Sequence, residues 1–467
     1  MKPAELTATP AAALAVERDE RRKRTAHILK GGAGVFGLRV GALVLGLVAD
    51  LVLTNALGLE RYGLFAIGVS WLSVLVPVGT LGMNTALLKV VPSEQDGERP
   101  GLVRGMVRWS GRRMLIAGVV LGALFAGGVL LAGDRVPADL RGVLLVLAGF
   151  LPVQVLAVHR GAVLQALKHP VLSLLPEQVL RVSAFLLLVL ALYAFRGEEL
   201  GAQGAAWAYG GGMVVGLIFA GAWARKRTPE TIRGAAPSID ASAWWLLALP
   251  MCWNTVMRLL NSRADPAMLG WLLGEEGIAS AGGYSIANRL ASLLLFGMVA
   301  ANAVAAPHIS ELHAKGERAE LQRMVSLVAK GLTAYALPLA LLMVAIGPWL
   351  LTRFGEGFDA AYPTLCILVA ARTLTCLAGT VGFLLALTGH QGRVARLMTG
   401  CAALKIALNF ALIPTYGELG AAVATLVMLA LFTGLAWRDV RRLVGIEPTV
   451  LAGLGWLPSA PSEEARR

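Results

Sequence analysis

The sequence contains little charge, few cysteines and few aromatic residues for its length. Charged side chains make up 15% of its 467 residues, whereas an average soluble protein has about 25%. The four cysteines all lie in apolar stretches, which excludes a secreted fold held together by disulfides. The sequence also lacks a P-loop motif, which argues against direct hydrolysis of ATP by this chain.

Apolar residues are correspondingly abundant. Hydrophobic residues account for 57% of the chain, a further 54 residues are glycine, and the mean hydropathy is +0.68. Soluble proteins contain about 45–50% apolar residues even when glycine is included, so a water-soluble fold could not cover this much apolar surface. The composition therefore predicts an integral membrane protein.

Twelve apolar windows have the length that an α-helix needs to cross a bilayer, about 20 residues. They cover residues 28–54, 62–91, 111–132, 142–166, 171–195, 202–224, 243–271, 280–306, 327–351, 363–388, 396–415 and 417–437. The first window is too long for a cleavable signal peptide and predicts an uncleaved span. We therefore expect an all-α membrane protein with about twelve transmembrane helices.

The basic excess of the chain follows this predicted topology. Lys and Arg number 42 against 29 Asp and Glu, a net charge of +13. Basic residues concentrate before the first window, in the even-numbered connections and after the last window, as at Arg225, Lys226 and Arg227. By the positive-inside rule both ends of the chain are cytosolic. Because the charge follows topology and no aromatic-basic motif accompanies it, we expect no nucleic-acid partner.

The two halves of the chain repeat one pattern. Gly-Met at 82–83 recurs at 297–298, an offset of 215 residues, and Gly-Glu-Arg at 97–99 recurs at 316–318, an offset of 219. The offset spans six predicted helices, an even number, which indicates two parallel bundles with a site between them, as in transporters. The predicted regions are a cytosolic basic tail (1–26), an N-terminal six-helix lobe (27–224), a cytosolic linker (225–242), a C-terminal six-helix lobe (243–437) and a cytosolic tail (438–467).

Several motifs resemble one known family. The segments 248–254, 261–265 and 283–289 resemble the seventh and eighth helices of the polysaccharide-unit flippases in the MOP (multidrug/oligosaccharidyl-lipid/polysaccharide) exporter superfamily. Residues 408–417 resemble the turn between the eleventh and twelfth helices of that family. The resemblance covers about residues 30–440 and implies two pseudo-symmetric lobes with both ends in the cytosol.

The resemblance also implies a function, which is transport and not enzymatic. Such a flippase moves undecaprenyl-pyrophosphate-linked oligosaccharide units from the cytosolic to the periplasmic leaflet of the bacterial inner membrane by alternating access. The product would be an exopolysaccharide or the O-antigen of lipopolysaccharide. The implied partners are the lipid-linked oligosaccharide, membrane lipid, and a polymerase, co-polymerase and initiating transferase.

Three alternatives stay open at this point. An ion-coupled multidrug exporter of the same superfamily would need an anion-rich cavity to bind cationic drugs. A lipid II flippase of that superfamily usually carries two more helices. A membrane glycosyltransferase or ligase usually needs a larger extramembrane loop or an acidic motif.

Eleven Asp, Glu, Lys or Arg residues lie well inside the predicted spans, away from the window ends, where charge is costly and normally faces a cavity or a partner. Three are acidic, namely Asp50, Glu177 and Asp265, and eight are basic, namely Arg39, Arg160, Arg181, Arg258, Arg263, Arg289, Arg372 and Lys405. Purely structural ion pairs would need similar numbers, so the excess predicts an anionic ligand, and guanidinium groups suit a pyrophosphate. The predicted cationic cavity consists of Arg39, Arg258 and Arg289, with Arg263, Arg372 and Lys405 as further contributors. The alternative for each cation is an intramembrane ion pair or a side chain that reaches a lipid headgroup.

The repeat places charges at equivalent positions of the first and seventh spans. Arg39 corresponds to Arg258, and Asp50 corresponds to Asp265. Both carboxylates are candidates for coupling transport to Na⁺ or H⁺, because burial can make a carboxyl group exchange protons. Structural pairing is the alternative, with Arg263 as the neighbour of Asp265.

The remaining polar motifs predict no chemistry. Glu177 and Arg181 stand at i and i+4 on one helical face and predict a structural ion pair. His308, Glu311 and His313 fit no zinc motif, so we predict neither a metal site nor a resident cofactor. No arrangement suited to nucleophilic catalysis is present.

Overall fold

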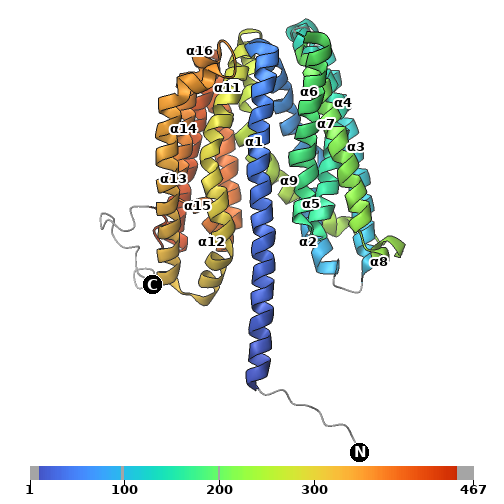
Figure 1. Cartoon of the computed structure of the whole chain (residues 1–467), viewed down its shortest axis with the longest axis vertical. Helices are drawn as coiled ribbons and strands as arrows, with labels where there is room; N and C mark the ends of the chain where they lie inside the picture. Colours follow the sequence, from blue (N-terminus) through green and yellow to red (C-terminus); the bar gives the residue numbers. More distant parts are fainter. Residues whose placement is uncertain (1–9, 96–98, 198–199, 450–467) are drawn as a thin grey trace, which may run out of the picture.

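The computed structural model describes residues 10–95, 99–197 and 200–449 of the chain (Figure 1). The ends of the two predicted tails, residues 1–9 and 450–467, lie outside this range. All regular elements of the described residues are helical, as expected for an all-α protein. The first half contains α1 (Pro10–Gly79), α2 (Met83–Gln95), α3 (Pro100–Ala132), η1 (Gly133–Arg135), α4 (Ala138–Ala166), α5 (Pro170–Leu175), η2 (Pro176–Leu180), α6 (Arg181–Arg196) and α7 (Ala202–Arg227). The rest contains α8 (Glu230–Gly234), α9 (Ala241–Arg263), α10 (Asp265–Leu273), α11 (Glu276–Ala291), η4 (Ser292–Leu294), α12 (Leu295–Lys315), α13 (Arg318–Thr352), η5 (Phe358–Ala361), α14 (Tyr362–Leu377), α15 (Val381–Leu387) and α16 (Gln391–Leu443).

Nine helices of the described chain are long and apolar enough to cross a membrane, so this is a multi-pass membrane protein. The sequence predicted twelve spans, and the difference lies in how the helices are divided. The long helix α1 contains the first predicted window and most of the second, with a break at Gly58 (φ 75°), and α16 contains the last two windows, with a break at Gly417 (φ 55°). Glycine adopts these positive φ angles without a steric penalty. The predicted span 243–271 is shared between α9 and α10.

The helices form two bundles, one on each side of α1 in Figure 1. In the first bundle α4 packs between α3 and α7, and in the second α14 packs between α13 and α16. Helices α1 and α9 lie at the interface, where α1 packs against α10 and α11, and α9 packs against α2 and α16. We call the end that holds α8 the linker end, and the opposite end, where α1 and α16 break, the turn end (Figure 1).

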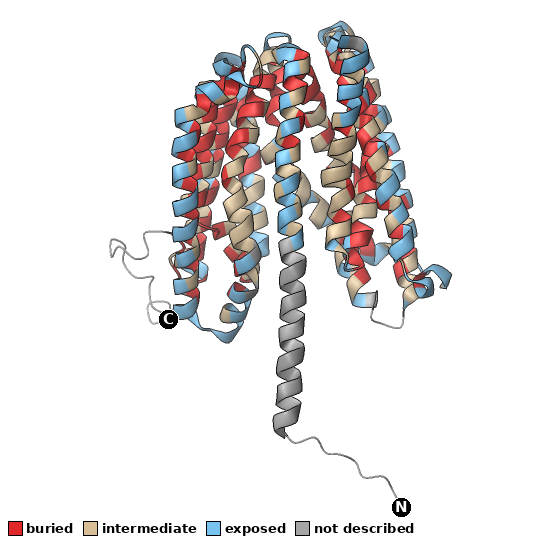
Figure 2. Cartoon of the chain, viewed as in Figure 1, coloured by how far each residue is buried: buried red, intermediate tan, exposed pale blue. Residues whose placement is uncertain are grey.

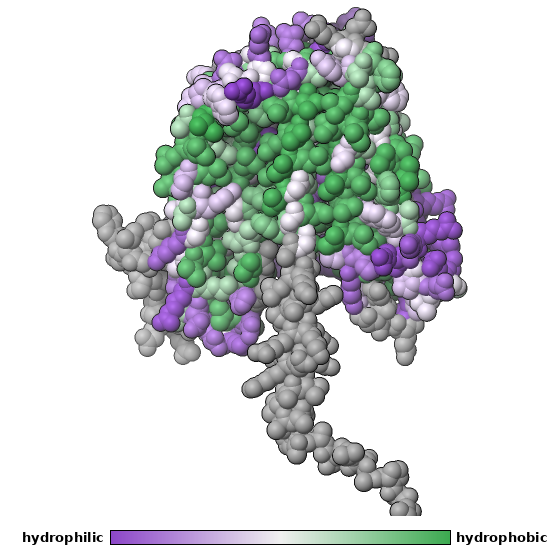
Figure 3. Space-filling view, in the orientation of Figure 1, coloured by the Kyte–Doolittle hydropathy of each residue, from purple (hydrophilic) through white to green (hydrophobic). Residues whose placement is uncertain are grey.

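Apolar side chains cover the outside of the molecule as well as its core. Buried residues face the interior of each bundle, and exposed residues face outward (Figure 2). The outer face nevertheless carries an apolar band between two polar ends (Figure 3). Leu131 and Phe195, for example, are 90% and 89% exposed. A band of this kind suits contact with lipid, because helices pair most of their backbone polar groups internally.

The segment that joins the bundles lies on α3. The Ser238 amide donates a hydrogen bond of 3.0 Å to the Gly101 carbonyl, and the Arg104 guanidinium donates to the Ala235 carbonyl. A Cβ at Gly105 would lie 1.8 Å from the Ser238 carbonyl oxygen, so only glycine permits this approach. These contacts attach the start of α9 to the first bundle.

Glycines also bring the bundles together toward the turn end. A Cβ at Gly63 of α1 would lie 1.9 Å from the carbonyl oxygen of Ile278 in α11. A Cβ at Gly282 of α11 would lie 2.9 Å from the carbonyl oxygen of Leu59 in α1. The two backbones therefore approach each other closely at these glycines, and we call this the glycine contact.

Candidate functional site

Each of the three carboxylates predicted from the sequence to be important has a basic partner. The pairs are Asp50 Oδ2 with Arg289 Nε at 3.0 Å, Asp265 Oδ2 with Lys405 Nζ at 2.8 Å, and Glu177 Oε1 with Arg181 Nε at 3.3 Å. The first pair joins the two bundles, the second lies within the second bundle, and the third lies within the first bundle. Three of the eight predicted cations are thus matched by a carboxylate.

Asp265 and Lys405 form the most deeply buried pair, with side chains 3% and 2% exposed. Lys405 Nζ also donates 2.5 Å to the Asn261 carbonyl. The other Asp265 oxygen accepts from Asn409 Nδ2 at 2.9 Å, and the Tyr284 hydroxyl donates to Asp265 Oδ2 at 2.5 Å. The network joins α9, α10, α11 and α16 and leaves the carboxylate fully partnered.

This network differs from the sequence prediction in two ways. The sequence suggested Arg263 as the neighbour of Asp265, but side chains two residues apart do not face each other on a helix, and α9 ends at Arg263. The sequence also suggested Lys405 as a contributor to the cationic cavity. Instead, the lysine is buried against Asp265, because the packing of α16 on α10 brings the two together.

Asp50 and Arg289 form a more open pair at the interface of the bundles. Their side chains are 17% and 35% exposed, and the Tyr62 hydroxyl hydrogen-bonds Asp50. Arg263 lies close enough to interact electrostatically with both members of the pair. Although Arg289 Nε is 3.0 Å from Asp50, the geometry is not that of a hydrogen bond, since this nitrogen has no acceptor among the described residues. The contact is therefore ionic.

Glu177 and Arg181 lie where the fifth predicted span is irregular. Glu177 is in η2, a π-helical turn, and Arg181 begins α6. Gln154 Nε2 donates 2.8 Å to the Glu177 carboxylate, and the Arg181 guanidinium lies 5.1 Å from the ring centre of Tyr209. The pair connects η2 with α4 and α7.

A tyrosine contacts each of the three ion pairs. The sequence analysis did not predict these tyrosines. The chain has seven tyrosines. Tyr62 contacts Asp50, Tyr209 contacts Arg181, and Tyr284 contacts Asp265. Tyrosines within predicted spans were an available signal, because a buried hydroxyl normally needs a polar partner.

Five predicted cations have no carboxylate oxygen within 4 Å in the described part of the chain. They are Arg39, Arg160, Arg258, Arg263 and Arg372. Arg372 Nη2 donates 3.2 Å to Asn288 Oδ1, while its buried Nε has no acceptor among the described residues. Arg372 and Arg263 interact electrostatically, so Arg263, Arg289 and Arg372 form what we call the arginine cluster.

Arg39 and Arg258 lie outside the arginine cluster, nearer the linker end. Arg39 precedes Asp50 by 11 residues and Arg258 precedes Arg263 by five, so they lie about 16 Å and 8 Å further along their helices at a rise of 1.5 Å per residue. Both side chains are exposed. The five unmatched cations thus extend along the bundle interface and adjacent helices instead of meeting at one point.

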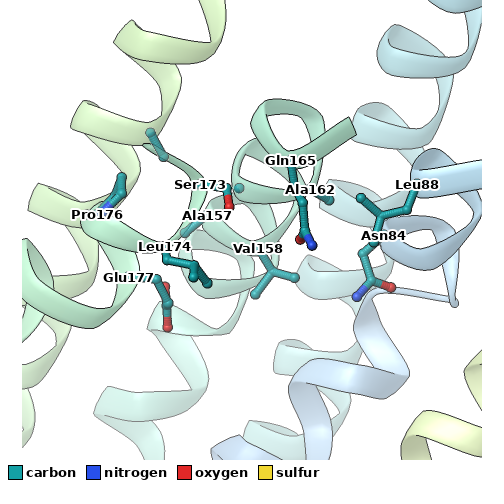
Figure 4. A pocket seen from close by; sticks show the side chains of 13 residues that line it. Asn84, Leu88, Ala157, Val158, Ala162, Gln165, Ser173, Leu174, Pro176 and Glu177 are labelled. Atoms are coloured by element: carbon teal, nitrogen blue, oxygen red, sulfur yellow. The ribbon is translucent and has the colours of Figure 1, made fainter. Parts of the chain in front are cut away.

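The first bundle contains a separate pocket of 170 Å³ (Figure 4). Asn84, Gln165, Ser173 and Glu177 supply its polar groups, and apolar side chains such as Val158 form the remaining wall. The pocket does not include the arginine cluster. A groove of 380 Å³ between α12 and α13 is lined by His308, Glu311, Glu320 and Arg323 among others. Within the described residues, no group of three or more His, Cys, Asp and Glu could hold a metal ion.

Comparison with known proteins identifies the family of this chain. A family model described as polysaccharide biosynthesis protein matches residues 28–313. The chain is a member of this family. No curated protein sequence matches the chain.

Solved structures show the fold of this family member. An inward-facing multidrug resistance MATE family transporter of the MOP superfamily superposes with a TM-score of 0.67, 16% identity, and coverage of 86% of this chain and 94% of that chain. The lipid II flippase MurJ, in an inward closed conformation, superposes with a TM-score of 0.68 and 13% identity. The match covers 87% of this chain and 87% of that chain. An outward-facing MATE transporter superposes with a TM-score of 0.59 and 16% identity, and the match covers 89% of this chain and 94% of that chain. The chain therefore has the fold that these MATE transporters share with MurJ, as the resemblance to the MOP superfamily predicted.

Proposed function

We propose that this protein translocates a polyprenyl-diphosphate-linked oligosaccharide, such as an undecaprenyl-linked unit, from the cytosolic to the outer leaflet of a bacterial inner membrane. The unit would serve the synthesis of an exopolysaccharide or of O-antigen. The observation that carries this proposal is the excess of intramembrane cations, of which five have no carboxylate partner in the described residues. Membership of the polysaccharide biosynthesis family supports the saccharide part of the ligand.

The arginine cluster suits a diphosphate. Arginine binds phosphate through planar, two-point hydrogen bonds, which lysine cannot reproduce. Arg289 and Arg372 each keep a buried Nε–H donor without an acceptor among the described residues. Two unsatisfied charged donors are expensive in a low-dielectric interior, and an anionic ligand would satisfy both. The polyprenyl chain could stay in the surrounding lipid during transfer.

A binding measurement tests the ligand class. We expect the purified protein in phosphatidylcholine nanodiscs to bind farnesyl diphosphate but not farnesol. Arg263→Ala and Arg372→Ala should each weaken binding about tenfold, the usual effect of losing a charge-assisted hydrogen bond. Arg225→Ala, which removes an exposed arginine at the end of α7, should bind like the wild type. Equal binding by all four proteins would contradict the assignment.

A cellular experiment tests the direction of transport. Deletion of the gene should leave lipid-linked oligosaccharide on the cytosolic leaflet and remove surface polysaccharide. The wild-type gene should restore export, whereas Arg258→Ala and Arg263→Ala, at normal protein levels, should not. Full rescue by both variants would separate the cationic residues from transport.

The fold likeness to MATE and MurJ supports two alternatives, export of cationic drugs and flipping of lipid II. A drug exporter would make the deletion strain sensitive to cationic dyes while surface polysaccharide stays normal. A lipid II flippase would be needed for cell-wall synthesis itself. The cation excess is opposite in sign to what a cationic drug requires.

Ion coupling and assembly partners also belong to the proposal. Asp265 is occupied by Lys405, so of the two predicted coupling carboxylates Asp50 is the better candidate for Na⁺ or H⁺. Dissipation of each gradient in turn during transport into vesicles would identify the ion. A polymerase, a co-polymerase and an initiating transferase would act before and after this step, and co-purification would detect their contact.

A further inference from the structure

One ion pair of the site crosses between the bundles. Asp50 lies on α1, which enters the first bundle, and Arg289 lies on α11 of the second bundle. The other two pairs stay within one bundle each. A change in the Asp50–Arg289 contact therefore alters how the bundles hold together.

The surface of α1 is shaped to receive Arg289. Gly46 and Asp50 are four residues apart and lie on the same face of the helix. A Cβ at Gly46 would lie 2.1 Å from Arg289 Nη2, so the guanidinium rests directly on the α1 backbone. A larger residue at Gly46 would displace the guanidinium from its position beside Asp50.

This pair lies inward of the glycine contact on the same two helices. Arg289 follows Gly282 by seven residues and Ile278 by 11, which is about 10 to 16 Å along α11. The Asn55 amide at the turn end donates 2.9 Å to the carbonyl of Arg353, which follows α13. The ion pair and these outer contacts together join the bundles toward the turn end.

Asp50 binds its neighbouring arginines less strongly than a diphosphate would. One carboxylate serves Arg289 and also interacts with Arg263, and the pair is partly exposed and lacks a directed hydrogen bond. A diphosphate carries more charge and more acceptor oxygens, so it would bind the same guanidinium groups better. Once bound, it would also repel the Asp50 carboxylate.

We propose that Asp50 is a placeholder for the ligand and that a diphosphate, by displacing it from Arg289, releases the glycine contact and opens the turn end. The inference rests on the proposed function, because it uses the diphosphate as ligand. Asp50 acts through Arg289 and is a positioning residue. It lowers ligand affinity while coupling ligand binding to opening.

The test combines affinity with a report on closure. The reference protein carries Ser at the four native cysteines and Cys at Asn55 and Arg353, whose contact spans the turn end. A short bis-maleimide reports closure as crosslinking yield in phosphatidylcholine nanodiscs. Farnesyl diphosphate is the probe, farnesol is its uncharged control, and Asp134→Asn is the matched variant, because Asp134 is an exposed outer carboxylate.

We expect farnesyl diphosphate, but not farnesol, to lower crosslinking in the reference and in Asp134→Asn. Asp50→Asn should bind farnesyl diphosphate about fivefold more tightly, the usual limit for a partly exposed ion pair. Its crosslinking yield should be low without ligand and should not fall further when farnesyl diphosphate is added. Asp50→Glu should behave as the reference does. If Asp50→Asn fails to fold, Gly46→Ala keeps both charges and should give the same increase in affinity and loss of response.

Other results would contradict the placeholder role of Asp50. Unchanged or weaker binding by Asp50→Asn, or a normal crosslinking response in that variant, would overturn the placeholder role while leaving the flippase proposal intact. Failure of the reference protein to bind farnesyl diphosphate would overturn both proposals.

Discussion

Lys405 carries its charge in the most enclosed environment of the site. Its ammonium group and the Asp265 carboxylate are almost fully removed from solvent. Taking two charges out of water costs several kcal/mol, which is offset only when further hydrogen bonds complete the pair. Asn261, Asn409 and Tyr284 supply those bonds. This residue therefore stabilises the second bundle only as part of the whole network.

Removal of Lys405 should be strongly destabilising. Lys405→Ala leaves Asp265 charged and buried without its counter-charge, and we expect a loss of about 3–5 kcal/mol. Thermal unfolding of the purified protein in detergent checks this as a lower Tm. Lys226→Ala, at an exposed lysine at the end of α7, should leave Tm unchanged. The double variant Lys405→Met with Asp265→Asn should recover most of the loss, and failure to recover would point to packing instead of charge.

The residue types of the site could be predicted from the sequence, but not their partners. Every intramembrane cation of the described site was found from hydropathy, since charge stands out in an apolar window. Partners depend on contacts between distant helices, as for Lys405 and Asp265, 140 residues apart. The prediction for Arg263 followed sequence proximity, which is a poor guide on a helix because i and i+2 diverge.

At the scale of elements, α1 and α11 make a close approach between the bundles. Gly63 and Gly282 let these helices touch backbone to backbone. The Ile278 and Leu59 side chains lie beside this contact, which provides dispersion but no directed bond, so the two helices can separate there without breaking a hydrogen bond or ion pair. Helices that break and reform contact during transport benefit from this property.

A side chain at Gly63 should hold the turn end open. Gly63→Val would place its Cβ 1.9 Å from the Ile278 carbonyl oxygen, which the rigid helices can relieve only by moving apart. We expect crosslinking between Cys at Asn55 and Cys at Arg353 to fall several-fold. Gly127→Ala on α3, where a Cβ would meet nothing within 4 Å, should crosslink as before. Normal crosslinking by Gly63→Val would mean that α11 can shift without opening this end.

The elements were easier to predict than their boundaries. Every predicted window lies mainly on helix, because a span of about 20 apolar residues has few other ways to satisfy its backbone in lipid. The merged α1 and α16 and the split at Ala264 depend on single backbone angles, such as φ 75° at Gly58. Hydropathy averages over about 20 residues and does not report such angles.

At the scale of the whole molecule, the two halves repeat in sequence but differ in chemistry. Asp50 and Asp265 occupy equivalent places in the repeat. Asp50 is partly exposed between bundles, whereas Asp265 is sealed inside one bundle by Lys405. The first carboxylate is therefore available to respond to a ligand and the second is committed to stability.

The charge distribution predicts the orientation of the molecule. We expect a fluorescent protein fused after Arg467 to fluoresce and a periplasmic phosphatase at the same place to be inactive, because the basic end should be cytosolic. A cysteine at Asp134 should react with an impermeant maleimide from outside intact spheroplasts, whereas one at Arg225 should not. The reverse labelling pattern would invert the topology.

The Lys405–Asp265 pair also has a consequence for ionic conditions. Mobile ions screen exposed charges over about 10 Å at 0.1 M salt, but they reach buried pairs far less. Lys405 is a counter-ion fixed by a covalent bond, so dilution cannot remove it and added salt cannot exchange it. Asp50 and Arg289 are within reach of dissolved ions. The strength of the buried pair in the second bundle should therefore not change with salt concentration, whereas the strength of the ion pair between the bundles should.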